Sequence, residues 1–81
     1  MIISFQESAK KDLRKIDKQV VLRILKNIQK LEDYPDIANV KKLKNHYPPQ
    51  RFRIGDYRVL FDIVDNEIIV INIKHRREAY I

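Results

Sequence analysis

The sequence predicts an α+β fold: two N-terminal helices packed on one face of a small, mainly antiparallel sheet, in the order β-α-α-β-β-β. In the first half of the chain, apolar residues recur at steps of three and four, as in amphipathic helices. After residue 50, short apolar segments are separated by two-residue turn sequences, which indicates a meander of strands. With 81 residues the chain fits one domain, residues 1–81.

The first half is expected to form a strand and two helices. Residues 2–6 (IISFQ) have the β-branched and aromatic character of an opening strand. Ser8 is expected to cap a first helix that runs to about Ile16. Asp17 is expected to cap a second helix, which should end near Tyr34 because the next residue, a proline, disfavours helical backbone before it.

The second half is expected to begin with an ordered connection over residues 35–50, pinned to the core by Ile37, Val40 and Leu43. The pattern then predicts three strands, over residues 51–54, 57–63 and 68–74. Two-residue hairpin loops separate them, at Gly55–Asp56 and Asp65–Asn66. Such short loops fix which residues of neighbouring strands lie opposite each other.

The first loop pairs Arg53 with Arg58, so that Arg51, Arg53 and Arg58 project from one side of the sheet. Like charges opposed across a sheet destabilise it by about 0.2–1 kcal/mol. A cluster of three arginines on one side of the sheet therefore needs an explanation. The other side is continuously apolar and is expected to face the helices, with Phe52, Ile54, Tyr57, Val59, Phe61 and Ile63.

The second loop extends the register and gives the pairs Asp62–Ile69, Leu60–Ile71 and Arg58–Ile73. The arginine side is then expected to carry aliphatic residues as well, with His75 just beyond them: Leu60, Ile69, Ile71 and Ile73. A sheet that is apolar on both faces needs cover. We expect either the chain after Lys74 or another protein to lie on this side.

The charge of the chain favours a polyanionic partner. The net charge is +6 and the isoelectric point is about 9.7, so nucleic acid is the first partner to consider. Five of the seven arginines fall in residues 51–77, whereas nine of the ten lysines precede residue 51. Arginine offers phosphate a planar fork, and lysine only a point charge. The arginine side therefore predicts an anion site, with a merely solvated surface as the alternative.

The composition argues against several other classes of protein. Cysteine is absent, which excludes disulfides and thiolate metal sites. Two histidines and no carboxylate cluster at ligand spacing predict no metal and no cofactor. The N-terminal apolar run is too short for a signal peptide, and no segment approaches the roughly 20 apolar residues of a membrane span. A cytoplasmic protein without membrane contacts is expected.

The closing sequence HRREAY, residues 75–80, places groups that can move protons beside further cations. His75 can exchange protons near neutral pH, and the cations near Tyr80 favour a tyrosinate. A surface histidine and a packing tyrosine are the alternatives.

These segments resemble the RelE/ParE superfamily of bacterial and archaeal toxins, and in particular its RelE-like branch. The resemblance rests on KKLK (residues 41–44), RFRIGDYRVLFDI (51–63) and IKHRREAYI (73–81). It implies a microbial-RNase-like RelE fold and a toxin of a type II toxin–antitoxin system. It further implies metal-independent cleavage of messenger RNA in the ribosomal A site, by attack of a 2′-hydroxyl that leaves a 2′,3′-cyclic phosphate.

The resemblance also implies roles for individual residues. Arg51 and Arg53 match paired basic residues of the family's second strand, where lysines are frequent. Arginine is much harder to deprotonate, so these two are expected to stabilise phosphate rather than to act as bases. Arg58 follows a GxYR-like tyrosine. The catalytic set implied is Arg53, Arg58, Arg76, Tyr80 and His75, and the substrate-binding set is Arg51, Lys44 and Arg77, with no metal.

A cognate antitoxin is the partner that the resemblance implies, RelB-like, acidic and helical, beside mRNA and the ribosome. Two other functions stay open at this point. ParE-like members inhibit DNA gyrase without nuclease chemistry, and a non-catalytic relative would bind only nucleic acid or an antitoxin.

Overall fold

The computed structural model describes residues 1–78. Its elements are β1 (Ile2–Phe5), α1 (Glu7–Arg14), α2 (Lys18–Ile28), the 3₁₀ helix η1 (Gln29–Asp33), β2 (Val40–Lys42), β3 (Gln50–Ile54), β4 (Tyr57–Val64) and β5 (Glu67–His75). The predicted α+β class is confirmed, with one strand more than expected.

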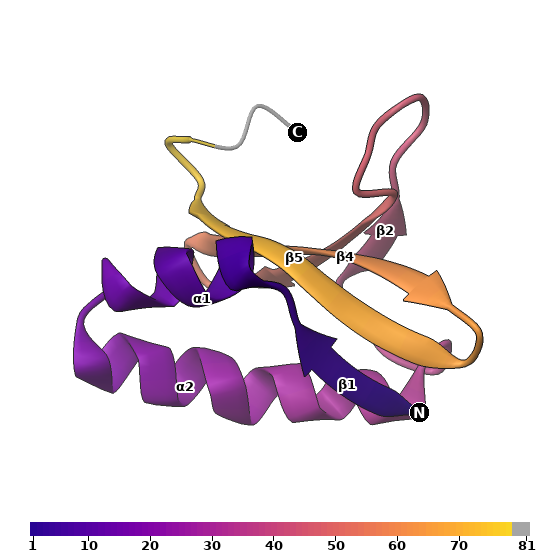
Figure 1. Ribbon diagram of the computed structural model, residues 1–81, viewed down its shortest axis with the longest axis horizontal. Coiled ribbons are helices and arrows are strands. Elements are labelled where there is room, and N and C mark those ends of the chain that lie inside the picture. The colour runs from indigo at the N-terminus through magenta and orange to yellow at the C-terminus, as the bar shows by residue number, and fades with distance from the viewer. Residues whose placement is uncertain (79–81) are drawn as a thin grey trace.

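The sheet has the strand order β1-β5-β4-β3-β2, and only the β1–β5 pair is parallel among the described strands. Helix α2 runs along one side of the sheet, whereas the β2–β3 loop and the segment after β5 project from the opposite side (Figure 1). The core fills the space between helices and sheet. It is built from Ala9, Ile24, Ile28, Leu31, Phe52, Ile54, Val59, Phe61, Ile68, Val70 and Ile73.

The helix caps were predicted correctly at one of two positions. Asp17 caps α2, and its Oδ2 accepts the backbone N–H of Gln19 at 3.2 Å. Ser8 is not a cap: α1 begins one residue earlier, with Gln6 at the N-cap position and no capping side chain. The Ser8 hydroxyl instead donates to the backbone oxygen of Ile71 in β5. Ser8 therefore lies in the first turn of α1 and links this helix to β5.

Strand β2 was not predicted, because its three residues lie inside the expected connection. Val40, Lys41 and Lys42 pair with Phe52, Arg51 and Gln50 of β3. The element is too short to show alternation, so only Val40, expected to pin the connection to the core, gave a sign of it. The pairing sets Lys41 directly opposite Arg51 at the edge of the sheet.

The predicted register is right in the first hairpin and wrong in the far half of the second. Arg53 faces Arg58 as expected, and Asp62 faces Ile69. A bulge between Leu60 and Phe61 then shifts the ladder, which gives the pairs Leu60–Asn72, Val59–Ile73, Arg58–Lys74 and Tyr57–His75. One extra residue in a strand reverses the faces of all residues beyond it. The shift buries Ile73 in the core, which is the physical reason that favours it.

The apolar centre of the outer face is covered by the chain itself. Leu60 and Ile71 are buried there, and Leu43, in the loop after β2, is buried too, although none belongs to the core cluster between helices and sheet. The backbone N–H of Leu43 donates to the oxygen of Pro49 at 2.7 Å, which closes this loop. A second protein, which was one of the two covers expected from the sequence, is therefore not needed to shield these side chains.

Candidate functional site

Three arginines of the β3–β4 hairpin project from the outer face of the sheet. Arg53 lies directly opposite Arg58, and Arg51 lies two residues earlier in β3, opposite Leu60. Their neighbours Phe52 and Ile54 point the other way and are buried in the core. The hairpin therefore gathers three guanidinium groups on one rigid surface, as the sequence predicted.

Arg58 is the group most affected by this arrangement. Its Nε and Nη1 atoms are buried, and within residues 1–78 neither has a hydrogen-bond partner. Burial lowers the pKa of Arg58, and so do the positive charges of Arg53, Arg51 and Arg76, while Asp56 acts in the opposite direction. A guanidinium that is both desolvated and surrounded by like charge is unfavourable for folding, and a bound anion would relieve both effects.

Arg76 is brought to this cluster by the turn of the hairpin. Its backbone N–H donates to the oxygen of Asp56 at 2.7 Å, and its Nε lies 3.7 Å from Oδ1 of the same residue. The turn needs Gly55, whose φ of +56° is strained for other residues and whose Cβ position would lie 3.3 Å from Nη2 of Arg23. The tight turn thus anchors the chain segment that follows β5.

His75 is not brought together with the arginines. The shifted register places it opposite Tyr57, so both side chains lie on the helix-facing side of the sheet. The two rings meet edge to face, with centroids 5.2 Å apart. The imidazole Nδ1 accepts the backbone N–H of Arg77 at 3.2 Å, which puts the ring proton on Nε2 when the ring is neutral. The expectation that His75 lies on the arginine side was therefore wrong.

The remaining predicted residues lie at the margins of the cluster. Lys44 is exposed in the loop after β2, and Arg77 is exposed directly after Arg76. Tyr80, the expected C-terminal tyrosine, lies outside the residues that the structure describes. Within residues 1–78, no group of three or more His, Cys, Asp or Glu side chains could hold a metal ion.

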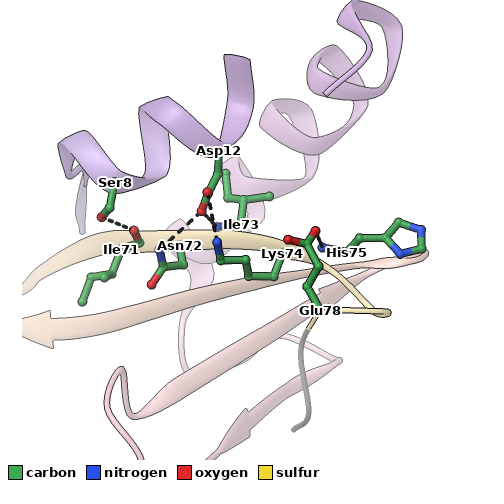
Figure 2. A network of polar contacts seen from close by, with 8 residues as sticks. All are labelled: Ser8, Asp12, Ile71, Asn72, Ile73, Lys74, His75 and Glu78. Atoms are coloured by element: carbon green, nitrogen blue, oxygen red, sulfur yellow. Dashed lines mark hydrogen bonds and ion pairs between the residues drawn. The ribbon is translucent and has the colours of Figure 1, made fainter. Parts of the chain in front are cut away.

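A second polar cluster joins α1 to β5, and the sequence did not reveal it (Figure 2). Asp12 has a side chain only 10% exposed, and its carboxylate accepts three hydrogen bonds. The donors are Nδ2 of Asn72 at 3.3 Å, the backbone N–H of Ile73 at 2.9 Å and Nζ of Lys74 at 3.2 Å. Lys74, which pairs with Arg58 in the ladder, is thus bound to a carboxylate on another element.

The second cluster exists because β1 is shorter than β5. Strand β1 pairs with residues 67–70 only, which leaves the rest of that edge of β5 without a strand partner among the described residues. Side chains of α1 hydrogen-bond to this edge instead. The Ser8 hydroxyl donates to the backbone oxygen of Ile71, and the Asp12 carboxylate accepts the backbone N–H of Ile73. Predicting these contacts from the sequence would have required the length of β1 and the bulge in the β4–β5 ladder, and neither leaves a local pattern.

The chain is similar to known toxins in sequence. The sequence profile of the family described as "ParE toxin of type II toxin-antitoxin system, parDE" matches residues 3–80. A protein of Escherichia coli named as a candidate RelE-like toxin is 27% identical over 70 residues, which are 84% of this chain and 73% of that protein.

The fold is similar to that of toxins in solved toxin–antitoxin complexes. A chain of the RelBE2 complex of Mycobacterium tuberculosis superposes with a TM-score of 0.78 and 22% identity, covering 93% of this chain and 96% of that chain. A chain of the RelB–RelE complex of Methanococcus jannaschii gives a TM-score of 0.76 and 24% identity, covering 94% and 93%. No helix within residues 1–78 is long and apolar enough to cross a membrane. The family profile spans nearly the whole sequence, and the chain therefore belongs to the ParE toxin family of type II toxin–antitoxin systems, within the RelE/ParE superfamily.

Proposed function

We propose that this toxin is a metal-independent endoribonuclease that cleaves mRNA in the ribosomal A site and so stops translation. The observation that supports the proposal is that the Arg58 guanidinium lacks hydrogen-bond partners and has further positive charges around it. Its buried Nε and Nη1 have no partner within residues 1–78, and three further arginines act on it electrostatically. A phosphate group supplies both the hydrogen-bond acceptors and the negative charge that this site is short of.

The proposed reaction is attack of a ribose 2′-oxygen on the adjacent phosphorus. The new bond from the 2′-oxygen to phosphorus forms while the bond to the 5′-oxygen breaks, which leaves a 2′,3′-cyclic phosphate and a 5′-hydroxyl. Negative charge grows on the phosphorane oxygens between these events. Preorganised donors aimed at such a charge are usually the largest single catalytic contribution. Arg53, Arg58 and Arg76 are assigned to this role, and Arg51 to binding beside them.

The proton transfers need other groups, because an arginine side chain stays protonated near neutral pH. The 2′-hydroxyl proton must leave, and the 5′-oxygen must gain a proton. We assign this part to Tyr80, on the resemblance of the C-terminal sequence to the family. His75 has no part in the proposal, since its ring lies against Tyr57 on the other side of the sheet. Lys44 and Arg77 would contact RNA phosphates at the margins.

An antitoxin is the second partner that we propose. The similar structures from M. tuberculosis and M. jannaschii are complexes of a toxin with a RelB antitoxin. An acidic, helical antitoxin would complement the net charge of +6 and would occupy the outer face where the arginines lie.

Cell-free translation with purified protein tests the nuclease directly, with mRNA 5′ ends mapped by primer extension. The wild type and Arg58→Ala would be compared with ribosomes present and absent. Arg14→Ala is a matched control, because Arg14 is an exposed arginine of α1 whose only described ion pair is with Glu7. We expect ribosome-dependent cuts within codons for the wild type and Arg14→Ala and none for Arg58→Ala. Intact mRNA with the wild type would overturn the proposal.

A second candidate function is inhibition of DNA gyrase, and the description of the matching family as ParE toxin favours it. This function requires no arginine cluster, which is why we place it second. A supercoiling assay with purified gyrase separates the two. Gyrase inhibition that persists in Arg58→Ala, with mRNA left intact, would replace the nuclease by this function. Salt-dependent RNA binding without either activity would indicate a non-catalytic relative.

A further inference from the structure

The hairpin turn places one carboxylate inside the arginine cluster. Asp56 stands in the turn between β3 and β4, two residues before Arg58. Its backbone oxygen accepts the N–H of Arg76 at 2.7 Å, and its Oδ1 lies 3.7 Å from Nε of Arg76. Both side chains are 61% exposed, so solvent and a ligand can reach the pair. A negative charge at an anion site is unexpected, because it repels the ligand.

We propose that Asp56 is a positioning residue that holds the Arg76 guanidinium beside Arg58 and, through its own charge, weakens the binding of RNA phosphate in the ground state. The inference rests on the proposed nuclease function. It predicts that removal of the charge changes affinity and rate in opposite directions: RNA binds more tightly and is cleaved more slowly.

The two effects have separate physical origins. At Arg58 the charge of Asp56 acts in the opposite direction to the charges of Arg51, Arg53 and Arg76. Neutralising it raises the local positive potential, and every phosphate that approaches gains from this. The Asp56 carboxylate is also an ion-pair partner of Arg76, and within residues 1–78 one backbone hydrogen bond, from Arg76 to Asp56, joins this segment to the turn. Without that partner the guanidinium samples more rotamers, so fewer molecules present it correctly to the phosphorane.

The other hairpin provides a matched control. Asp65 stands in the turn between β4 and β5 and is exposed, and its φ of 48° is a conformation that asparagine adopts readily. The eight residues of β4 separate the two turns. At about 3.3 Å per residue the separation is about 25 Å, which exceeds the screening length of about 10 Å in 0.1 M salt. Asp65→Asn therefore removes the same charge without acting on the cluster.

The experiment compares wild type, Asp56→Asn and Asp65→Asn in two measurements. Binding is measured by fluorescence anisotropy with an RNA oligonucleotide whose 2′-hydroxyls are all methylated, so that it cannot be cleaved. Cleavage is measured at saturating programmed ribosomes.

We expect Asp56→Asn to bind the oligonucleotide about two- to fivefold more tightly. We expect it to cleave about three- to fivefold more slowly at saturation, the scale of an exposed ion pair. Asp65→Asn should match the wild type in both. Wild-type affinity or a wild-type saturated rate in Asp56→Asn overturns the inference.

A third measurement keeps the inference separate from the nuclease proposal. The ¹H–¹⁵N signal of the Arg76 Nε–H group reports its ion pair whether or not RNA is cleaved. If the wild type binds the methylated RNA but never cleaves RNA, the proposed function fails. The inference is then decided by tighter binding together with a shift of this signal toward that of a free arginine in Asp56→Asn. An unshifted signal overturns it.

Discussion

Two polar clusters lie near the C-terminal end of β5, and they differ in how well their charges are matched. At the α1–β5 junction, Asp12 binds the side chain of Lys74 and the backbone N–H of Ile73, so donors and acceptor are satisfied (Figure 2). On the outer face, Arg58 presents two buried nitrogen atoms without partners within residues 1–78. The first cluster has its partners within the described chain, whereas we propose that a bound phosphate supplies the partners of the second.

We interpret this difference as one of role: the charge of Asp12 stabilises the fold, and the charge of Arg58 serves the proposed function. Buried polar groups in folded proteins almost always have partners, so an exception needs an explanation. Asp12 needs none, because its burial is balanced by three hydrogen bonds that hold a helix against a strand. In Arg58, by contrast, the buried Nε and Nη1 have no hydrogen-bond partner within residues 1–78, and the neighbouring arginines lower the pKa of the group further. We therefore expect changes at the first cluster to reduce stability and changes at the second to reduce activity.

The largest expected effect is the loss of mRNA cleavage in Arg58→Met. Methionine fills a similar volume but carries no charge and no donor, so the phosphorane loses its central contact. We expect the rate to fall by about 10²–10³-fold, as when one donor is removed from an oxyanion hole. Primer extension in a cell-free translation system measures the rate, and circular dichroism verifies folding. A folded variant that keeps more than a tenth of the activity would contradict the functional assignment of this cluster.

The second prediction concerns the matched cluster. Asp12→Ala leaves the backbone N–H of Ile73 without its acceptor and removes the counter-charge of Lys74. We expect the free energy of unfolding in urea to fall by about 2–3 kcal/mol, since a buried group left unsatisfied costs about 1–3 kcal/mol. For a domain of this size the melting temperature would fall by roughly 10 °C or more. The cleavage rate of the folded fraction should stay the same.

Glu7→Ala is the control for Asp12→Ala on the same helix. Glu7 also forms an ion pair, with Arg14 at 3.4 Å, but both side chains are 64% exposed. Exposed pairs contribute about 0–1 kcal/mol, so this variant should change stability little. If both variants lose the same stability, the hydrogen bonds of Asp12 have no special role, and the contrast between the two clusters is lost.

Most of the fold could be predicted from the sequence, because the two-residue hairpin loops allow few registers between neighbouring strands. The turn at Gly55–Asp56 fixed the β3–β4 pairing and therefore the face of every arginine in that hairpin. What it could not reveal was the bulge beside Leu60, since a bulge depends on packing elsewhere and has no local signature here. That single shift moved His75 to the helix-facing side and set Lys74 opposite Arg58.

The candidate site was predictable to the extent that charge and register define it. The clustering of Arg51, Arg53 and Arg58 follows from alternation along each strand and from the register that the Gly55–Asp56 turn sets. The partners of these groups could not be read in the same way. Asp56 was assigned only as a turn residue, and its ion pair with Arg76 depends on how the chain leaves β5. Contacts between segments distant in sequence require the three-dimensional arrangement.

A third prediction sharpens the comparison through ligand binding. We expect inorganic phosphate to bind the arginine cluster of the folded state and not the unfolded chain, so it should raise the melting temperature of the wild type. At about ten times the dissociation constant the gain is about 1.4 kcal/mol. Sodium chloride at equal ionic strength is the control for general screening. Asp12→Ala should gain as much as the wild type from its lower starting point, and Arg58→Met should gain nothing. An equal gain in Arg58→Met would place phosphate elsewhere on the basic surface.

The smallest expected effect is a gain in stability when the charge of Arg58 is removed. Burial and the neighbouring arginines lower the pKa of Arg58, so the folded state holds its proton less firmly than the unfolded state does. Stability therefore rises with pH only in the strongly alkaline range where arginine deprotonates, and below that range the penalty is constant. We expect Arg58→Met to be more stable than the wild type by about 0.5–1 kcal/mol, the scale of like charges opposed on a sheet.

Urea unfolding should show the same gain from about pH 6 to pH 9, and added salt should reduce it by screening. A loss of stability in this variant at low salt would mean that Arg58 has a partner in the folded chain, and the contrast with Asp12 would disappear.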